Sequence, residues 1–242
     1  MLSKKSSSLQ HPSRNARRGA GGLTFLGLVF ALAACAQSGS RPAGMPTDIN
    51  APFLAEDMAI DEWVERFEGE SRAVFAHRSE IVDSLGLASG GAIADIGAGT
   101  GFFTALFDTK VGETGRVYAV EISPGFLAHL RERVEREQLE AVRVVEGSDR
   151  SVELPPASID VAFVCDVYHH FEHPEATLAS IRRALRPGGT LVLIDFERIP
   201  GTTSDYLLQH VRAGREVFSD EIVRSGFRFR DEIELEGLED NY

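Results

Sequence analysis

The stretch Ala92 to Thr104, AIADIGAGTGFFT, decides the fold of this chain. A short apolar run ends at Asp95, a second one begins at Phe102, and three glycines stand between them. This order predicts a strand, a tight glycine turn and a helix. Such glycines let a ligand approach the backbone, and the first turn of a helix has amides free to bind it. The stretch therefore predicts a nucleotide-type site on a doubly wound sheet.

The spacing of the glycines narrows the kind of ligand. Gly97, Gly99 and Gly101 give GxGxG, whereas dinucleotide-binding loops have GxGxxG. Glu121 follows about 20 residues later, at the end of the apolar run 117–120, where an acid that binds ribose is expected. DIGAGTG and this acid resemble the first motifs of the class I S-adenosylmethionine-dependent methyltransferases. For the glycines alone, a turn that binds nothing is the alternative.

The later segments alternate between strand and helix patterns. Ser123-Pro124 and His173-Pro174 each place a proline where a helix would begin. Further strands are predicted at 117–121, 141–146, 159–165 and 190–196. Alternating strands and helices give an α/β fold with a Rossmann-like, doubly wound sheet. Two helical patterns in 53–85 predict an N-terminal helical extension.

Several later motifs also match the family. LPPASID (154–160) and ALRPGGTLVLIDF (184–196) resemble its segments around the fourth and fifth strands. DVYHHF (166–171) resembles a subgroup of predicted methyltransferases. The family closes its sheet with a sixth strand and an antiparallel seventh. Residues 227–235 can supply the sixth, and the short acidic stretch after them predicts a short or missing last strand.

The resemblance implies S-adenosylmethionine as the cofactor and assigns the glycine loop to it. Asp95 would orient the loop and help to bind the ammonium group of the ligand. Gly97, Gly99 and Gly101 would let its methionyl part approach the backbone. The loop is therefore expected to contact the amino-acid end of the cofactor.

The resemblance also assigns residues after the next strands. Glu121 would accept both ribose hydroxyls, because a carboxylate offers two acceptor oxygens to a diol. Asp149 would bind the adenine amino group. The backbone around Cys165 and Asp166 would hold the ammonium or the edge of the sulfonium. The cofactor is thus expected to lie across the carboxyl ends of the strands.

Tyr168, His169 and His170 follow the predicted fourth strand and are the candidate catalytic residues on the acceptor side. A histidine with a pKa near neutral can remove a proton from a hydroxyl or amine during methyl transfer. The alternative for each ring is a helix cap or a place in the core. No spacing of His, Cys and Asp predicts zinc, and a metal patch of His169, His170 and His173 would be fortuitous. No metal is therefore predicted.

The N-terminal residues predict export. In 1–34, a basic, serine-rich start leads into an apolar run at 23–32 that is too short to span a bilayer, which is typical of a signal peptide. LAAC (32–35) resembles the bacterial lipobox, which implies a membrane anchor through lipidated Cys35. Residues 35–52 would form a flexible tether and 53–242 the methyltransferase domain. If the start codon is wrongly chosen, the enzyme is cytoplasmic.

The composition limits the partners. The formal net charge is −12, and an acidic surface repels phosphate backbones, so nucleic acid is not an expected partner. The methyl acceptor is expected to be a small molecule, which the sequence does not name. Two other classes stay open: a non-catalytic, membrane-tethered ligand-binding protein and a nicotinamide-dependent oxidoreductase. The second would share the fold and Glu121, but the glycine spacing disfavours it.

Overall fold

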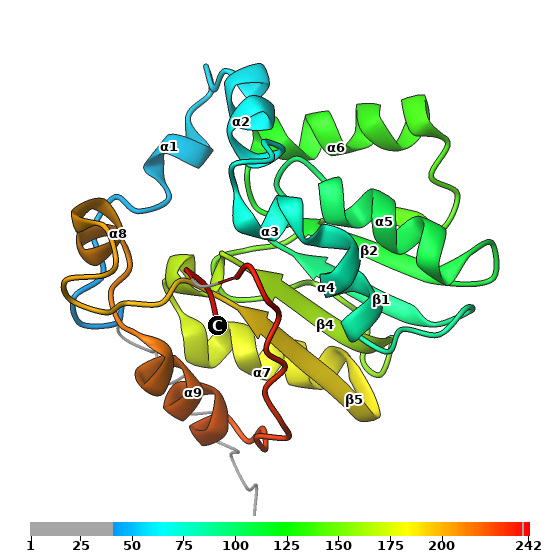
Figure 1. The fold of residues 1–242 in the computed structure, drawn as a ribbon. Coiled ribbons are helices and arrows are strands. Elements are labelled where there is room, and N and C mark those ends of the chain that lie inside the picture. Colours follow the sequence, from blue (N-terminus) through cyan, green and yellow to red (C-terminus); the bar gives the residue numbers. More distant parts are fainter. Residues whose placement is uncertain (1–40, 239) are drawn as a thin grey trace, which may run out of the picture. The chain divides into compact units, whose positions relative to one another are not determined.

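Five parallel strands form the central sheet in the order β3-β2-β1-β4-β5 (Figure 1). The structure is a computed structural model that describes residues 41–238 and 240–242. The strands are β1 (Ala92–Ile96), β2 (Arg116–Glu121), β3 (Val142–Glu146), β4 (Ile159–Cys165) and β5 (Leu185–Ile194). The predicted Rossmann-like fold is confirmed, whereas the predicted signal peptide and Cys35 lie outside the described residues.

The strand order reverses at β1, which pairs with β2 on one side and with β4 on the other. All five residues of β1 are buried, and β4 is buried over most of its length. Strands covered on both faces read as near-continuous apolar runs, which is why both were visible in the sequence. The loops that leave β1 and β4 diverge at this point, and such folds place their ligand cleft there.

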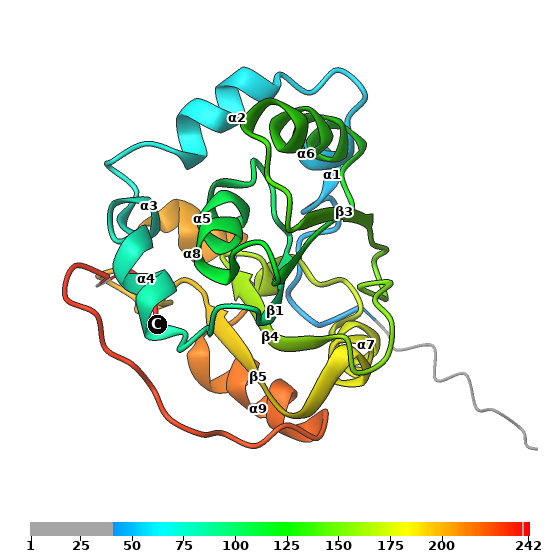
Figure 2. The same cartoon turned by 90° about the vertical axis from the view of Figure 1, so that its right-hand side faces the viewer.

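Helices cover both faces of the sheet (Figure 1 and Figure 2). They are α4 (Arg78–Ser84), α5 (Phe102–Val111) and α6 (Pro124–Glu137) on one face, and α7 (Pro174–Ala184) and α9 (Arg215–Arg224) on the other. Phe107 and Leu130 are buried in the first core cluster, and Leu178 and Phe218 in the second. Each such side chain contributes about 1.5–3 kcal/mol by burial, so the two clusters hold the three layers together. Among the helices described, none has the length and apolar character needed to cross a membrane.

The N-terminal extension consists of short helices ahead of α4. They are α1 (Ala51–Leu54), α2 (Ile60–Phe67) and α3 (Ala73–Ala76). The structure differs from the predicted tether in 45–52, because Met45, Ile49 and Asn50 are buried. The two apolar side chains pack on the domain, and the Asn50 amide donates to Glu172 and to the carbonyl of His170. The folded part therefore includes residues ahead of the predicted boundary at 53.

The stretch 227–235 forms no strand, so the predicted sixth strand is wrong. Charged residues interrupt it at 228, 230, 231, 232 and 234. A strand covered on both faces has a near-continuous apolar run, which this stretch lacks. The antiparallel pairing is reduced to one bridge between Phe196 and Asn241, beside two backbone hydrogen bonds between Asp195 and Tyr242. The last strand is thus short, as predicted.

Candidate active site

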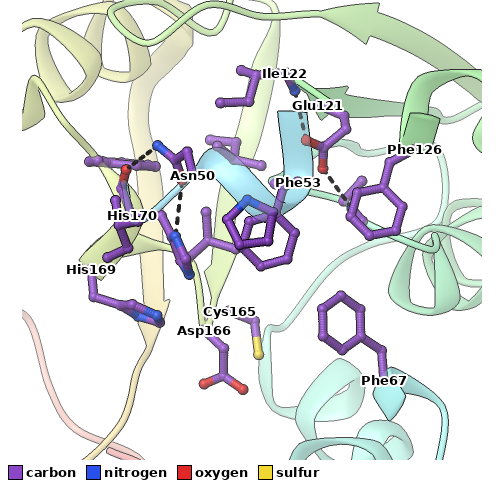
Figure 3. Close-up of a pocket in the computed structure, with 18 of the residues that line it drawn as sticks. Asn50, Phe53, Phe67, Glu121, Ile122, Phe126, Cys165, Asp166, His169 and His170 are labelled. Atoms are coloured by element: carbon purple, nitrogen blue, oxygen red, sulfur yellow. Dashed lines mark hydrogen bonds between the residues drawn. The ribbon is translucent and has the colours of Figure 1, made fainter. Parts of the chain in front are cut away.

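A cavity of about 760 Å³ lies at the carboxyl ends of β1, β2 and β4. The glycine loop and the loops after β2, β3 and β4 line it, together with residues of α1, α2 and α8 (Asp205–His210). Figure 3 shows Glu121 near Phe126 in one part of the cavity and His169 and His170 in another. The volume is typical of small-molecule sites, which run from roughly 300 to 1,000 Å³.

Gly97 and Gly99 both have positive φ angles, of 72° and 54°. A Cβ atom on Gly97 would lie 2.5 Å from Cγ1 of Val167, so this glycine allows the loop after β4 to pack against β1. A Cβ atom on Gly99 would meet nothing closer than the ring of Phe67, at 3.7 Å. Gly99 therefore borders open space in the cavity, where a ligand can approach its backbone.

Gly101 lies at the start of α5 and packs against α6. It does not line the cavity, and its φ of 84° makes it the left-handed N-cap of α5. A Cβ atom here would lie 2.6 Å from Cδ2 of Leu130. Gly101 therefore lets α6 pack closely against the start of α5, and its predicted contact with the ligand gains no support from its position.

Replacement of each cavity glycine by valine should have a different effect, on ligand binding at Gly99 and on stability at Gly97. Gly99→Val should abolish binding of S-adenosylmethionine and leave most of the fold, because the side chain enters open space. Gly97→Val should lower the free energy of unfolding by more than the roughly 1–3 kcal/mol of a strained residue, because it also overlaps Val167. Thermal unfolding and titration calorimetry measure both. A folded Gly99→Val variant that still binds the ligand would contradict the proposed approach to this backbone.

Glu121 ends β2 and holds the glycine loop. Its Oε2 accepts a hydrogen bond from the amide of Gly99 at 2.9 Å, and Oε1 accepts from the amides of Ile122 and Ser123 at 2.7 and 2.9 Å. Burial raises the pKa of this carboxyl, against the effect of the three donors. A carboxylate has about four acceptor positions, so only one remains while the Gly99 bond persists. Binding of both ribose hydroxyls, which stays a prediction, requires that bond to loosen.

Asp95 lies buried at the end of β1 and also lines the cavity. Its carboxylate accepts a hydrogen bond from Oγ1 of Thr104 at 2.5 Å, which ties β1 to the first turn of α5. Burial, with a smaller contribution from the charge of Glu121, raises its pKa to about 7. This contact fits the predicted role in orienting the loop. The contact with an ammonium group stays a prediction.

Asp166 follows β4 with a φ of 53°, a costly conformation for a residue other than glycine. Its buried carboxylate is 2.7 Å from Nη2 of Arg72 and accepts a hydrogen bond from Nδ2 of Asn241, also at 2.7 Å. Burial raises its pKa, and the Arg72 charge opposes the rise. Cys165 and Asp166 both line the cavity, so the structure places them where a ligand can reach them.

Asp149 lines the cavity in the loop after β3, where the adenine contact was predicted. Its carboxylate is half exposed and lies 3.2 Å from Nε2 of His173. His173 thus neighbours Asp149 and does not join the pair His169 and His170. The fortuitous patch considered from the sequence is therefore not formed.

His169 and His170 lie in the 3-10 helix η1 (Tyr168–His170), and both line the cavity. That they face the methyl acceptor stays a prediction. Nδ1 of His169 is 2.8 Å from Oδ1 of Asp195, and Nδ1 of His170 is 3.0 Å from Oδ1 of Asn50. Burial, helped by the neighbouring His169 and His210, lowers the pKa of His170 to about 2. His170 is therefore neutral at physiological pH, so its ring can bind a ligand but is a weak proton acceptor.

Tyr168 does not line the cavity, so its predicted catalytic role gains no support from its position. The ring is buried in the second core cluster, 4.9 Å from the ring of Phe218. Its hydroxyl donates to Glu221 at 2.9 Å, and Arg212 pairs with the same carboxylate. Successive residues of a 3-10 helix are rotated by about 120°, so the two histidines and the tyrosine cannot all face one side.

Aromatic side chains cover the cavity from the N-terminal extension. They are Phe53 of α1 and Trp63 and Phe67 of α2, next to Phe126 of α6. The ring centroids of Phe53 and Trp63 are 4.8 Å apart, and those of Phe67 and Phe126 are 6.1 Å apart. These rings give the middle of the cavity an apolar wall.

Residues 94–193 match a family model described as a methyltransferase domain. The match runs from β1 to β5 and so includes the glycine loop, Glu121 and η1. A solved SAM-dependent methyltransferase from Aquifex aeolicus superposes with a TM-score of 0.62 at 22% identity, covering 69% of this chain and 88% of that one. The fold is that of the class I methyltransferases.

Curated proteins have similar sequences over part of this chain. A 37.1 kDa protein of transposon TN4556 from Streptomyces fradiae is 34% identical over 157 residues, covering 64% of this chain and 44% of that protein. The ubiquinone/menaquinone biosynthesis C-methyltransferase UbiE of Shewanella pealeana is 29% identical over 118 residues, 48% of this chain and 47% of that protein. The chain spans less than half the length of these relatives. Neither alternative class gains support from these comparisons.

Proposed function

We propose that this protein transfers the methyl group of S-adenosylmethionine to a small-molecule acceptor. The observation that carries this proposal is that one cavity contains both Gly99 and Glu121 and the pair His169 and His170. The first two offer open backbone and a carboxylate, which suit an amino-acid chain and a ribose. The histidines offer ring nitrogens that suit a hydroxyl, thiol or amine.

S-adenosylmethionine supplies a methyl group on a sulfonium, a leaving group that needs no protonation. The work left to the protein is to position two molecules and to exclude water. Glu121 and Asp149 would hold the nucleoside, and the buried carboxyls of Asp95 and Asp166 would attract the ammonium group. The aromatic rings above the cavity would attract the sulfonium, because a ring face favours a cation.

The size and the covering of the cavity favour a small acceptor. Phe53, Trp63 and Phe67 lie over the middle of the cavity, between its cofactor part and its histidine pair. Glu68 pairs with Arg133 at 2.6 Å and so holds α2 against α6. A polymer would have to displace these contacts. The acidic net charge of −12 also disfavours a nucleic-acid acceptor.

The test combines binding with product analysis. The full chain is titrated with S-adenosylmethionine and, separately, with NAD, and is then incubated with S-adenosylmethionine and a small-molecule extract that is read by mass spectrometry. We expect binding of S-adenosylmethionine, and S-adenosylhomocysteine together with a methylated product only when extract is present. Tighter binding of NAD would favour the oxidoreductase, and binding without any product would favour the non-catalytic protein.

We also propose that the chain is held to a membrane through lipidated Cys35. The support is the order of a basic start, a short apolar run and LAAC. Cells fed radiolabelled palmitate should give a labelled protein in the membrane fraction. The Cys35→Ala variant should carry no label and should leave the membrane fraction. Unlabelled, soluble wild-type protein that keeps residues 1–34 would return the enzyme to the cytoplasm.

A further inference from the structure

Three histidines from two segments meet beside the acceptor part of the cavity. His169 and His170 come from η1, and His210 is the last residue of α8. One ring nitrogen of each lies within 4.8 Å of the others. All three rings line the cavity, with His169 buried and the other two partly exposed. The cluster is therefore accessible to a small ligand from one side.

The hydrogen bonds fix which nitrogen of two of these rings is available. The Asp195 carboxylate can only accept, so Nδ1 of a neutral His169 carries the proton. The Asn50 amide donates through Nδ2 to Glu172 and to a backbone carbonyl, so its Oδ1 accepts from Nδ1 of His170. Both rings therefore keep the lone pair on Nε2, and no described residue donates a hydrogen bond to either Nε2.

This arrangement has the parts of a metal site with an open position. Three imidazoles bound through one nitrogen each, with the other nitrogen donating to a carboxylate or an amide oxygen, form the ligand set of catalytic zinc centres. Asp195 is fully buried and is held by the backbone amides of His169 and Phe196, so it can orient His169 firmly. We propose that His169, His170 and His210 bind one divalent transition-metal ion, with Zn²⁺ as the best fit.

The three ring nitrogens must move closer together to bind one ion, since they now lie up to 4.8 Å apart. Zn–N bonds of 2.0–2.1 Å in a tetrahedral site bring the nitrogens to about 3.4 Å from one another. His210 can supply the movement, because it is partly exposed at the end of a short helix and stacks on exposed Tyr206, with ring centroids 5.4 Å apart. The positive charge of Arg66 lies near His210 and disfavours a bound cation. The negative charge of Asp195, next to His169, favours it.

The metal proposal deepens the proposed methyl transfer, on which its chemical consequence rests. A metal-bound hydroxyl or thiol loses its proton more readily, so the ion would prepare such an acceptor for attack on the methyl group. The ring nitrogens would then serve as ligands, and the proton of the acceptor would pass to bulk water. The bond between the methyl group and the sulfonium would break as the new bond to oxygen or sulfur forms, and S-adenosylhomocysteine would leave. An acceptor with an oxygen or sulfur atom is the class that this site favours.

Metal binding can be measured without any methyl donor. The full chain, free of affinity tags and stripped with chelator, is titrated with Zn²⁺ by calorimetry and with Co²⁺ by visible absorption. We expect one equivalent of each to bind, with the absorption of tetrahedral cobalt. Because S-adenosylmethionine is left out, the result does not depend on the proposed function. No binding of either ion, or Zn²⁺ binding with several weak equivalents, would overturn the site.

Variants assign the ligands. His210→Ala and His210→Gln should weaken Zn²⁺ by more than the 10–100-fold expected for Asn50→Ala, which removes only the orienting contact. His173→Ala is the matched control and should bind like wild type, since its ring neighbours Asp149. Far-ultraviolet circular dichroism checks that each variant is folded. Unchanged affinity in both folded His210 variants, or an equal loss in His173→Ala, would overturn the assignment.

Discussion

Glu121→Ala should weaken the binding of S-adenosylmethionine by about 10²–10⁴-fold. Each hydrogen bond between a charged group and the ribose contributes roughly 1.5–3 kcal/mol, so the loss of two costs roughly 3–6 kcal/mol, at 1.4 kcal/mol for each tenfold change. The variant also removes the acceptor of the Gly99 amide, which leaves the glycine loop less ordered. Titration calorimetry of the full chain measures the change.

The neighbouring strand offers a matched control for this variant. Glu146 ends β3 and pairs with Glu121 in the sheet register, but it is exposed and does not line the cavity. Glu146→Ala should therefore bind S-adenosylmethionine like wild type. If the Glu121 and Glu146 variants both keep wild-type affinity, Glu121 is not part of the cofactor site.

The cofactor part of the site could be predicted because its signals are local. The glycines and Asp95 belong to one continuous stretch, and Glu121 ends the next strand in the chain. Strands that are buried on both faces leave long apolar runs, so the ends of β1, β2 and β4 could be placed from the sequence. The loops at those ends must share one edge of a parallel sheet.

The acceptor part could not be predicted in the same way. Asn50, Arg72 and His210 come from segments outside the sheet and reach the cavity only through tertiary packing. No local pattern marks them, and Asn50 lies in a stretch whose composition is typical of a tether. Asp195 is different, because it directly follows β5, and the rule that ligands lie past the strand ends applies to it as well.

The position of Tyr168, away from the cavity, has a simple physical cause. DVYHHF places three polar rings after a strand, and the sequence cannot say which of them turn inward. The answer depends on η1, which directs Tyr168 toward Glu221 in the core and leaves the next two rings at the cavity. The sixth strand predicted at 227–235, which does not form, has a similar explanation. A strand needs a neighbouring apolar face as well as a suitable length, and the sequence does not show that face.

His169→Ala should lower the rate of methyl transfer by about 10²–10⁴-fold and leave the affinity for S-adenosylmethionine nearly unchanged. His169 is the buried ring that Asp195 orients, so it is the best-positioned group on the acceptor side. Its loss removes either a proton acceptor or a metal ligand, and both leave the acceptor protonated. Transfer of labelled methyl groups into the extract fraction that wild type methylates gives the rate.

Tyr168→Phe is the control in this experiment, because it changes the core side of η1 and leaves the acceptor side intact. The change removes one hydrogen bond to Glu221, worth roughly 0.5–1.5 kcal/mol of stability, and touches no group in the cavity. Its rate should stay within about twofold of wild type, whereas Asp195→Asn should lose rate together with His169→Ala because the ring loses its orienting carboxylate. Full activity in His169→Ala and in His170→Ala would mean that positioning alone, without an imidazole, carries the transfer.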